Sequence, residues 1–135
     1  MKKSKGLLVI MVIVLIIAGI MLGNYFLGIQ KYQKTVAEMT FENVDVSQIT
    51  DGTYEGECDV NYIYVKAEVT VQGGKIEKIT LLEHKNDRGA TAESIVDEMI
   101  RGNTTDVDTV SGATNSSKVI KKAVENALIK RIPYE

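Results

Sequence analysis

The sequence predicts a small α+β domain, with an antiparallel sheet and two amphipathic helices on one of its faces, preceded by a single N-terminal transmembrane helix. Three observations predict this fold class. No charged residue occurs between Lys5 and Lys31. Apolar and polar residues alternate over residues 62–71, which is typical of a half-buried antiparallel strand. Beyond residue 92 the apolar residues recur with the period of a helix, so the helices are expected to cover the sheet.

The uncharged segment, residues 6–29, is long enough to cross a membrane. As a helix it would extend roughly 36 Å, which exceeds the hydrocarbon core of a bilayer, about 30 Å thick. The alternative is a cleaved signal peptide, but its apolar run is only about 7–15 residues long and ends in a small-residue cleavage site. Lysines 2, 3 and 5 favour a cytoplasmic N-terminus. We expect residues 1–30 to be a single-pass anchor in the cell membrane, with an extracytoplasmic C-terminal domain.

The composition of the chain after Lys31 excludes some classes of function and disfavours others. The chain has 16 Lys and Arg and 18 Asp and Glu, and every acidic residue follows Lys31. An acidic domain disfavours nucleic acid as a partner, because phosphate backbones bind clustered Lys and Arg. Cys58 is the only cysteine, which excludes a disulfide-stapled fold, and we expect it to be a small buried residue near a strand. With one histidine in the chain, we predict no metal site.

The polar residues 31–50 predict a juxtamembrane helix extension that passes into a tether. The turn signal at Asp51 and Gly52 marks the expected start of the outer domain, residues 51–135. Residues 52–59 are predicted to form its first strand.

The central strand is predicted over residues 62–71. Two glycines after Gln72 indicate a hairpin turn, and residues 75–83 are predicted to return as the next strand. Ile76 and Ile79 fall out of phase, which indicates a bulge or a late strand start. The central strand places one apolar face toward the core, made by Ile63, Val65, Ala67, Val69 and Val71.

Two amphipathic helices are predicted after the polar loop 85–89. The first covers residues 92–101 and ends at Gly102 and Asn103. The second runs from about residue 116 to 130, where Lys130 suits its negative end and Pro133 stops it. Their apolar stripes are Ile95, Val96, Met99 and Ile100 in the first helix, and Val119, Ile120, Ala123, Val124, Ala127 and Leu128 in the second.

The connection between these helices carries the functional signal. Five of the seven residues 111–117 are Ser, Thr or Asn, whereas capping a helix needs only one of them. Gly112 and Ala113 remove side-chain bulk before Thr114, and a helix N-terminus favours a phosphate. From the residues alone, the segment is either a plain helix cap or a phosphate-binding turn, and its composition favours the turn.

Residues 108–114, DTVSGAT, resemble the flavinylation motif D-x-x-S/T-G-A-T of the FMN-binding domain family. This family includes the C subunit of the sodium-translocating NADH:quinone oxidoreductase and the G subunit of the Rnf electron-transport complex. The likeness extends over residues 51–129. It implies that Thr114 carries FMN through a phosphoester bond, installed by a separate FAD-dependent flavin transferase.

The resemblance also implies roles for the residues around Thr114. Asp108 would be recognised by the transferase or assist proton removal, and the hydroxyls of Ser111 and Ser117 would donate hydrogen bonds to the phosphate. No His or Lys adjoins Thr114 in the sequence to act as a base, so we predict no catalytic residue in this chain. The implied cofactor-binding residues are Thr114, Asp108, Ser111, Gly112, Ala113 and Ser117.

The function expected from these features is that of a membrane-anchored, extracytoplasmic flavoprotein that relays electrons between redox partner proteins. A carrier or a subunit of a redox complex is favoured over a complete enzyme, because the chain has neither a G-x-G-x-x-G nucleotide-binding motif nor an acid/base cluster. The alternative is a non-redox membrane-anchored module with the same fold that binds a ligand or mediates cell-surface interactions.

Overall fold

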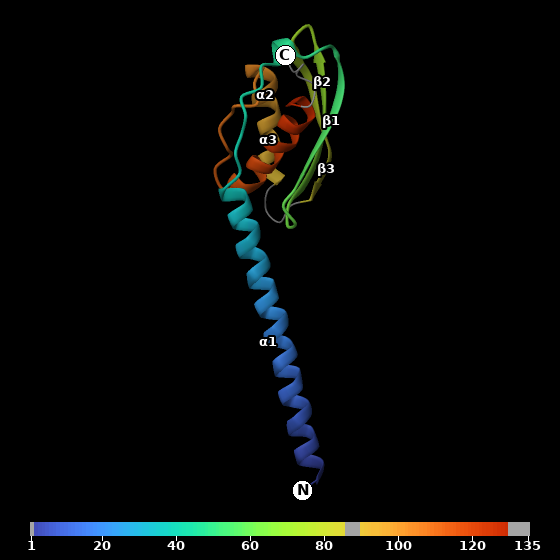
Figure 1. Cartoon of the computed structure of the whole chain (residues 1–135), viewed down its shortest axis with the longest axis vertical. Helices are drawn as coiled ribbons and strands as arrows, with labels where there is room; N and C mark the ends of the chain where they lie inside the picture. The colour runs from blue at the N-terminus through green and yellow to red at the C-terminus, as the bar shows by residue number, and fades with distance from the viewer. Residues whose placement is uncertain (1, 86–89, 130–135) are drawn as a thin grey trace. The chain divides into compact units, whose positions relative to one another are not determined.

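The computed structural model describes residues 2–85 and 90–129 of the chain (Figure 1). The chain divides into two compact units, residues 1–34 and 35–135. Helix α1, Lys2–Ala37, makes up the first unit, and its last residues belong to the second. The loop predicted after Lys85 and the helix-ending signals at Lys130 and Pro133 lie outside the described residues.

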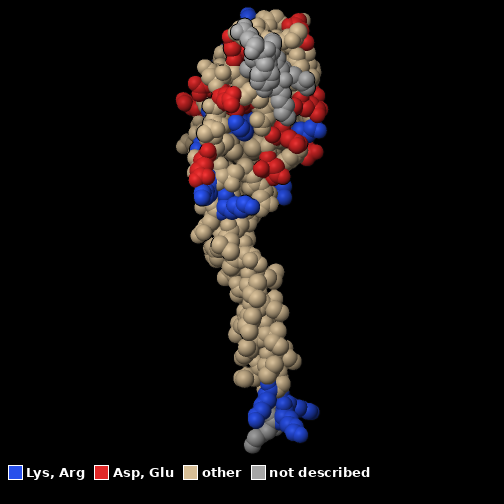
Figure 2. All heavy atoms as spheres, viewed as in Figure 1, with Lys and Arg blue, Asp and Glu red and all other residues tan. Residues whose placement is uncertain are grey.

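Helix α1 is long and apolar enough to cross a membrane. A helix in the core of a soluble protein buries one side, but every large apolar side chain from Leu7 to Leu27 is exposed in this structure. Figure 2 shows an uncharged helix surface between the lysines at its start and the charged residues that begin at Lys31. These properties agree with the predicted membrane segment.

The second unit contains one antiparallel sheet of three described strands in the order β1-β2-β3. Strand β1 is Gly52–Asp59, β2 is Tyr64–Gln72 and β3 is Lys75–Lys85. The predicted alternation along β2 is confirmed, because its inward-facing side chains are fully or almost fully buried. Gly73 and Gly74 both have positive φ angles, 60° and 72°, which glycine adopts without strain, and they form the predicted hairpin turn.

A bulge explains the phase of the two isoleucines in β3. Val71 pairs with Ile76, but the preceding residue, Thr70, pairs with Lys78, so Glu77 is an extra residue in β3. The extra residue brings both Ile76 and Ile79 to the buried face.

The described helices of this unit cover one face of the sheet (Figure 1). The 3₁₀ turn η2, Ala90–Ser94, leads into α2, Ile95–Gly102, which packs on β3. Helix α3, Thr114–Ile129, packs on β1 and β2 and begins two residues before its predicted start. All six apolar residues predicted to form the inner stripe of α3 are buried, so the predicted α+β layering is confirmed.

The polar character of residues 31–50 predicts a tether, but in the structure several apolar side chains of residues 36–49 pack into the second unit. Four of them, Val36, Val44, Val46 and Ile49, are at most 4% exposed. The short 3₁₀ turn η1, Val46–Gln48, belongs to this segment. The sequence did not predict the burial of these four residues. Isolated apolar residues in a polar stretch have no regular spacing that would indicate a buried helix or strand face.

Asn103 joins the end of α2 to the β2–β3 hairpin. It adopts the left-handed conformation, with a φ of 49°, and ends the helix as the sequence predicts. Its side-chain oxygen accepts the Ile76 N–H at 2.8 Å, and its amide nitrogen donates to the Gly74 carbonyl at 3.1 Å. Asn103 therefore ends the helix through its backbone conformation and holds the hairpin through its side chain.

We expect Asn103→Ala to lower the free energy of unfolding by about 2–4 kcal/mol. The left-handed conformation costs alanine about 1 kcal/mol, and the partly buried Ile76 N–H loses its acceptor, which costs about 1–3 kcal/mol. The control Asn103→Gly removes the same hydrogen bonds without the conformational strain and should be the less destabilised variant. Urea denaturation of the full chain in detergent, followed by circular dichroism, measures both. Wild-type stability in Asn103→Ala would show that these bonds do not hold the hairpin.

Candidate functional site

The turn before α3 is held by Ser117. The Ala113 carbonyl accepts the Ser117 N–H at 2.9 Å, the first hydrogen bond of the helix, so Ala113 is the N-cap residue. A methyl group accepts no hydrogen bond, and the usual side-chain cap is missing. Instead the Ser117 hydroxyl donates to the Ala113 carbonyl at 2.8 Å and accepts the Val110 N–H at 3.0 Å.

The predicted site residues fall into two groups. Thr114, Asp108, Ser111 and Gly112 are exposed, with Thr114 at the first position of α3. Ala113 and Ser117 are buried. The turn therefore presents the Thr114 side chain to solvent at the end of a helix where positive charge favours an anion.

The two buried residues shape the turn. In this structure the Ser117 hydroxyl donates its hydrogen to the Ala113 carbonyl and so helps to set the path of the backbone, while its hydrogen bond to a phosphate stays a prediction. Ala113 is 6% exposed, and its small size serves packing beneath the turn.

Gly112 has a φ of 79°, a conformation that residues with a side chain rarely adopt. A Cβ atom built at this position would meet no atom within 4 Å. Position 112 therefore favours glycine because of its backbone angle. It does not favour glycine for lack of space, because the space beside it is open.

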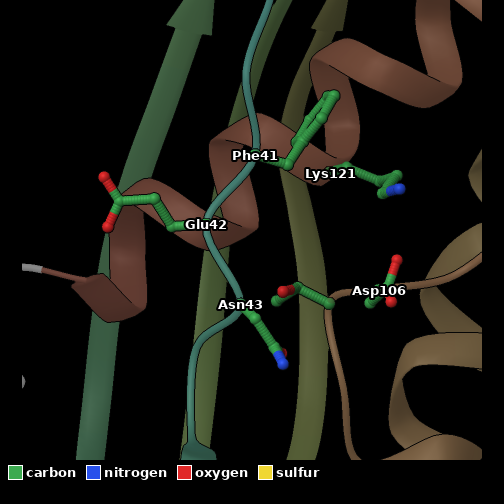
Figure 3. Close-up of a pocket in the computed structure, with 6 residues that line it drawn as sticks. Phe41, Glu42, Asn43, Asp106 and Lys121 are labelled. Atoms are coloured by element: carbon green, nitrogen blue, oxygen red, sulfur yellow. The ribbon is translucent and has the colours of Figure 1, made fainter.

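A small pocket lies on the same helix, farther from its start (Figure 3). It has a volume of about 150 Å³ and is open to solvent. Lys121 of α3 lines it, with its ammonium nitrogen 4.8 Å from the centre of the Phe41 ring. Figure 3 shows Lys121, Asp106 and Asn43 on one side of the segment 41–43 and the Glu42 carboxylate on the other. The lining residues are Phe41, Glu42, Asn43, Thr105, Asp106 and Lys121.

A buried ion pair holds one wall of this pocket. The Glu125 carboxylate is 1% exposed and accepts the Glu42 N–H at 3.0 Å and the Lys122 ammonium at 2.6 Å. The same ammonium donates to the Thr40 carbonyl at 2.8 Å. Residues 40–42 are therefore fixed to α3 through backbone groups.

The structure also places the chain's single histidine and cysteine. Nδ1 of His84, in β3, lies 2.9 Å from the Glu93 carboxylate in η2, so His84 connects the end of β3 to the following turn. Cys58 is half-buried in β1, and burial raises the pKa of its thiol to about 11. A protonated thiol is a poorer nucleophile than a thiolate.

Sequence reasoning missed the pocket because its residues come from three separate segments. One signal was present: Phe41 is one of only two phenylalanines in the chain and stands in an otherwise polar stretch. The spacing of Lys122 and Glu125 is visible in the sequence, but their partners are backbone groups more than eighty residues earlier.

We expect Ser117→Ala to open the turn before α3. The variant loses the acceptor of the Val110 N–H and a hydrogen bond in a fully buried position, which should cost about 1–3 kcal/mol of unfolding free energy. Ser111→Ala, which removes an exposed hydroxyl from the same turn, is the matched control and should change stability by less than about 0.5 kcal/mol. Hydrogen exchange at the Val110 amide reports the opening directly. Unchanged protection of this amide in Ser117→Ala would contradict the role of Ser117.

Comparison with known proteins places this turn in a family. Residues 63–129 match the FMN-binding domain family, and the match includes strands β2 and β3, both helices α2 and α3, and the Thr114 turn. A protein of Treponema pallidum (strain Nichols), described only as uncharacterized, is 32% identical over 85 residues. The matched region is 61% of this chain and 24% of that relative, so the chain spans about a quarter of its length. By its match over residues 63–129, this chain belongs to the FMN-binding domain family.

Proposed function

We propose that this protein is a membrane-anchored flavoprotein that carries FMN as a phosphoester on Thr114 and relays electrons outside the cytoplasm. One observation carries the proposal. In a chain that belongs to the FMN-binding domain family, Thr114, the last residue of the DTVSGAT sequence, is exposed at the first position of α3.

The geometry of the turn fits a phosphodiester at Thr114. Helix α3 is 16 residues long, and the first N–H groups of a helix point out of its end with a partial positive charge. The N-cap residue is Ala113, whose side chain cannot accept a hydrogen bond, so phosphate oxygens can occupy the position of the usual cap. Lys118 follows Thr114 by one turn on the same side of the helix and adds positive charge there.

We propose that a separate enzyme performs the attachment. Among the described residues, none is placed by a hydrogen bond to act as a base on the Thr114 hydroxyl, which is a weak nucleophile unaided. A separate FAD-dependent flavin transferase is therefore the proposed partner, and the exposed Asp108 and Ser111 are the side chains it would meet beside Thr114.

A tethered flavin supplies electron transfer through its ring, which the phosphoester leaves free. We propose that the flavin passes these electrons between redox partner proteins. Attachment by a covalent bond suits an extracytoplasmic site, because a cofactor outside the cell is lost if it dissociates.

Thr114→Ala should abolish covalent flavin and leave the fold intact. Thr114 is the first helical residue and not the N-cap, and alanine is the stronger helix former, so no loss of stability is expected. The matched control is Thr109→Ala, which removes a hydroxyl from a variable position of the same sequence motif. Both variants and the wild type would be co-expressed with a flavin transferase, and the intact masses compared.

The wild type and Thr109→Ala should each gain the mass of FMN less one water. Thr114→Ala should gain no mass. An unmodified wild-type chain would overturn the covalent assignment and favour the non-redox binding module. Flavin retained on Thr114→Ala would place the attachment at another residue.

We further expect protease added to intact protoplasts to remove the second unit and leave the anchor. The orientation follows from the lysines at positions 2, 3 and 5, since positive residues stay on the cytoplasmic side. A tag after residue 135, detected by immunoblot, should disappear from intact protoplasts. A signal protected until the membrane is lysed would show the inverted orientation.

A further inference from the structure

The pocket at Phe41 and Lys121 shares both α3 and the α2–α3 connection with the Thr114 turn. We propose that this pocket receives the pyrimidine edge of the isoalloxazine ring of the flavin attached to Thr114. The proposal rests on the function proposed above and names the part of the domain that holds the ring.

The helix geometry brings the pocket within reach of the attachment point. Lys121 follows Thr114 by seven residues, which returns it to the same side of α3 about 10 Å farther along the axis. Side chains of a helix lean toward its N-terminus, so Lys121 extends back in the direction of Thr114. The ribityl chain between the phosphate and the ring bridges a separation of this size.

The lining matches the chemistry of one edge of the ring. The pyrimidine edge presents two carbonyl oxygens with an N–H between them, whereas the opposite edge carries only methyl groups. Lys121 and Thr105 supply donors for the carbonyls, and Asp106 supplies an acceptor for the N–H. Asn43 supplies both kinds of group, and Phe41 adds an aromatic surface.

The size of the pocket agrees with partial enclosure. Its volume of about 150 Å³ is smaller than a site that surrounds a whole ligand of this kind, which has roughly 300 Å³ or more. One edge of the planar ring fits, and the remainder stays in solvent. A carrier needs this exposure, because its electrons must pass to another protein.

Three charged residues line the pocket, and two of them, Lys121 and Asp106, have opposite charges and lie on the same side of the segment 41–43 (Figure 3). The proposal therefore predicts opposite shifts of the flavin potential for these two residues. Reduction of a flavin with fewer protons than electrons leaves a negative charge at the pyrimidine edge. The Lys121 ammonium stabilises that charge and the Asp106 carboxylate opposes it. Lys121 therefore raises the midpoint potential of the attached flavin, and Asp106 lowers it.

The test is a redox titration of the full flavinylated chain in detergent, with Lys121→Gln, Asp106→Asn and the control Lys78→Gln. Lys78 is exposed and pairs with Thr70, so it lies on the face of the sheet opposite α3 and its loss changes the net charge equally. Intact mass first confirms that each variant carries FMN. The midpoint potential should shift down in Lys121→Gln, up in Asp106→Asn and not at all in Lys78→Gln.

A second readout uses Phe41→Ala, which opens one wall of the pocket. Quenching of flavin fluorescence by the neutral quencher acrylamide should become stronger than in the wild type. Fully flavinylated variants with wild-type potentials and wild-type quenching would place the ring elsewhere while leaving the covalent assignment intact. If Lys121→Gln carries less FMN than the wild type, the midpoint potential of Asp106→Asn tests the proposal instead. An upward shift supports the proposed ring site, and an unchanged potential contradicts it. An unflavinylated wild type would overturn the proposed function, and the ring site with it.

Discussion

The fold depends on the close approach of helix α3 to strand β1 at Gly56. A Cβ atom at this position would lie 2.3 Å from the Ala123 carbonyl oxygen and 2.3 Å from the Ala127 nitrogen, both backbone atoms of the helix. Only glycine permits this contact, and alanines at 123 and 127 complete it from the helix side. At this close approach the apolar residues of α3 are buried. The close approach also fixes the axis of α3, and both the Thr114 turn and the pocket at Lys121 are positioned by that axis.

A buried charge pair then attaches residues 40–42 to the outer side of this helix. Burying a carboxylate is costly unless its hydrogen-bonding capacity is met, and the Glu125 carboxylate is met by the Lys122 ammonium and the Glu42 N–H. Apolar side chains alone would hold a segment without selecting its register. The charged pair selects it, because Lys122 also requires the Thr40 carbonyl. Because these hydrogen bonds fix the position of residues 40–42, Phe41 and Glu42 form a wall of the proposed flavin-ring pocket.

The local features of the fold were readable because their causes lie in neighbouring residues. The alternation of apolar and polar residues along β2, and the helical period of the apolar residues in α3, each predict one buried face. Both predicted faces are buried in the structure. Two glycines after Gln72 allow the positive φ angles of the hairpin turn, and Asn103 ends α2 in the left-handed conformation. Even the bulge in β3 was indicated, since two isoleucines three residues apart cannot share a face of a regular strand.

The sequence by itself determined the long apolar N-terminal segment, the α+β class, the position of the Thr114 turn and its likeness to flavinylated domains. The tertiary structure alone decided that Ser117 faces inward to hold that turn, that residues 36–49 pack into the second unit, and that Phe41, Asp106 and Lys121 line one pocket. The physical reason is the range of the interactions. Periodicity, turn conformation and capping act between residues a few positions apart and leave a pattern in the sequence. Contacts between a side chain and a distant backbone group leave no such pattern, because every residue except proline offers the same backbone N–H and carbonyl.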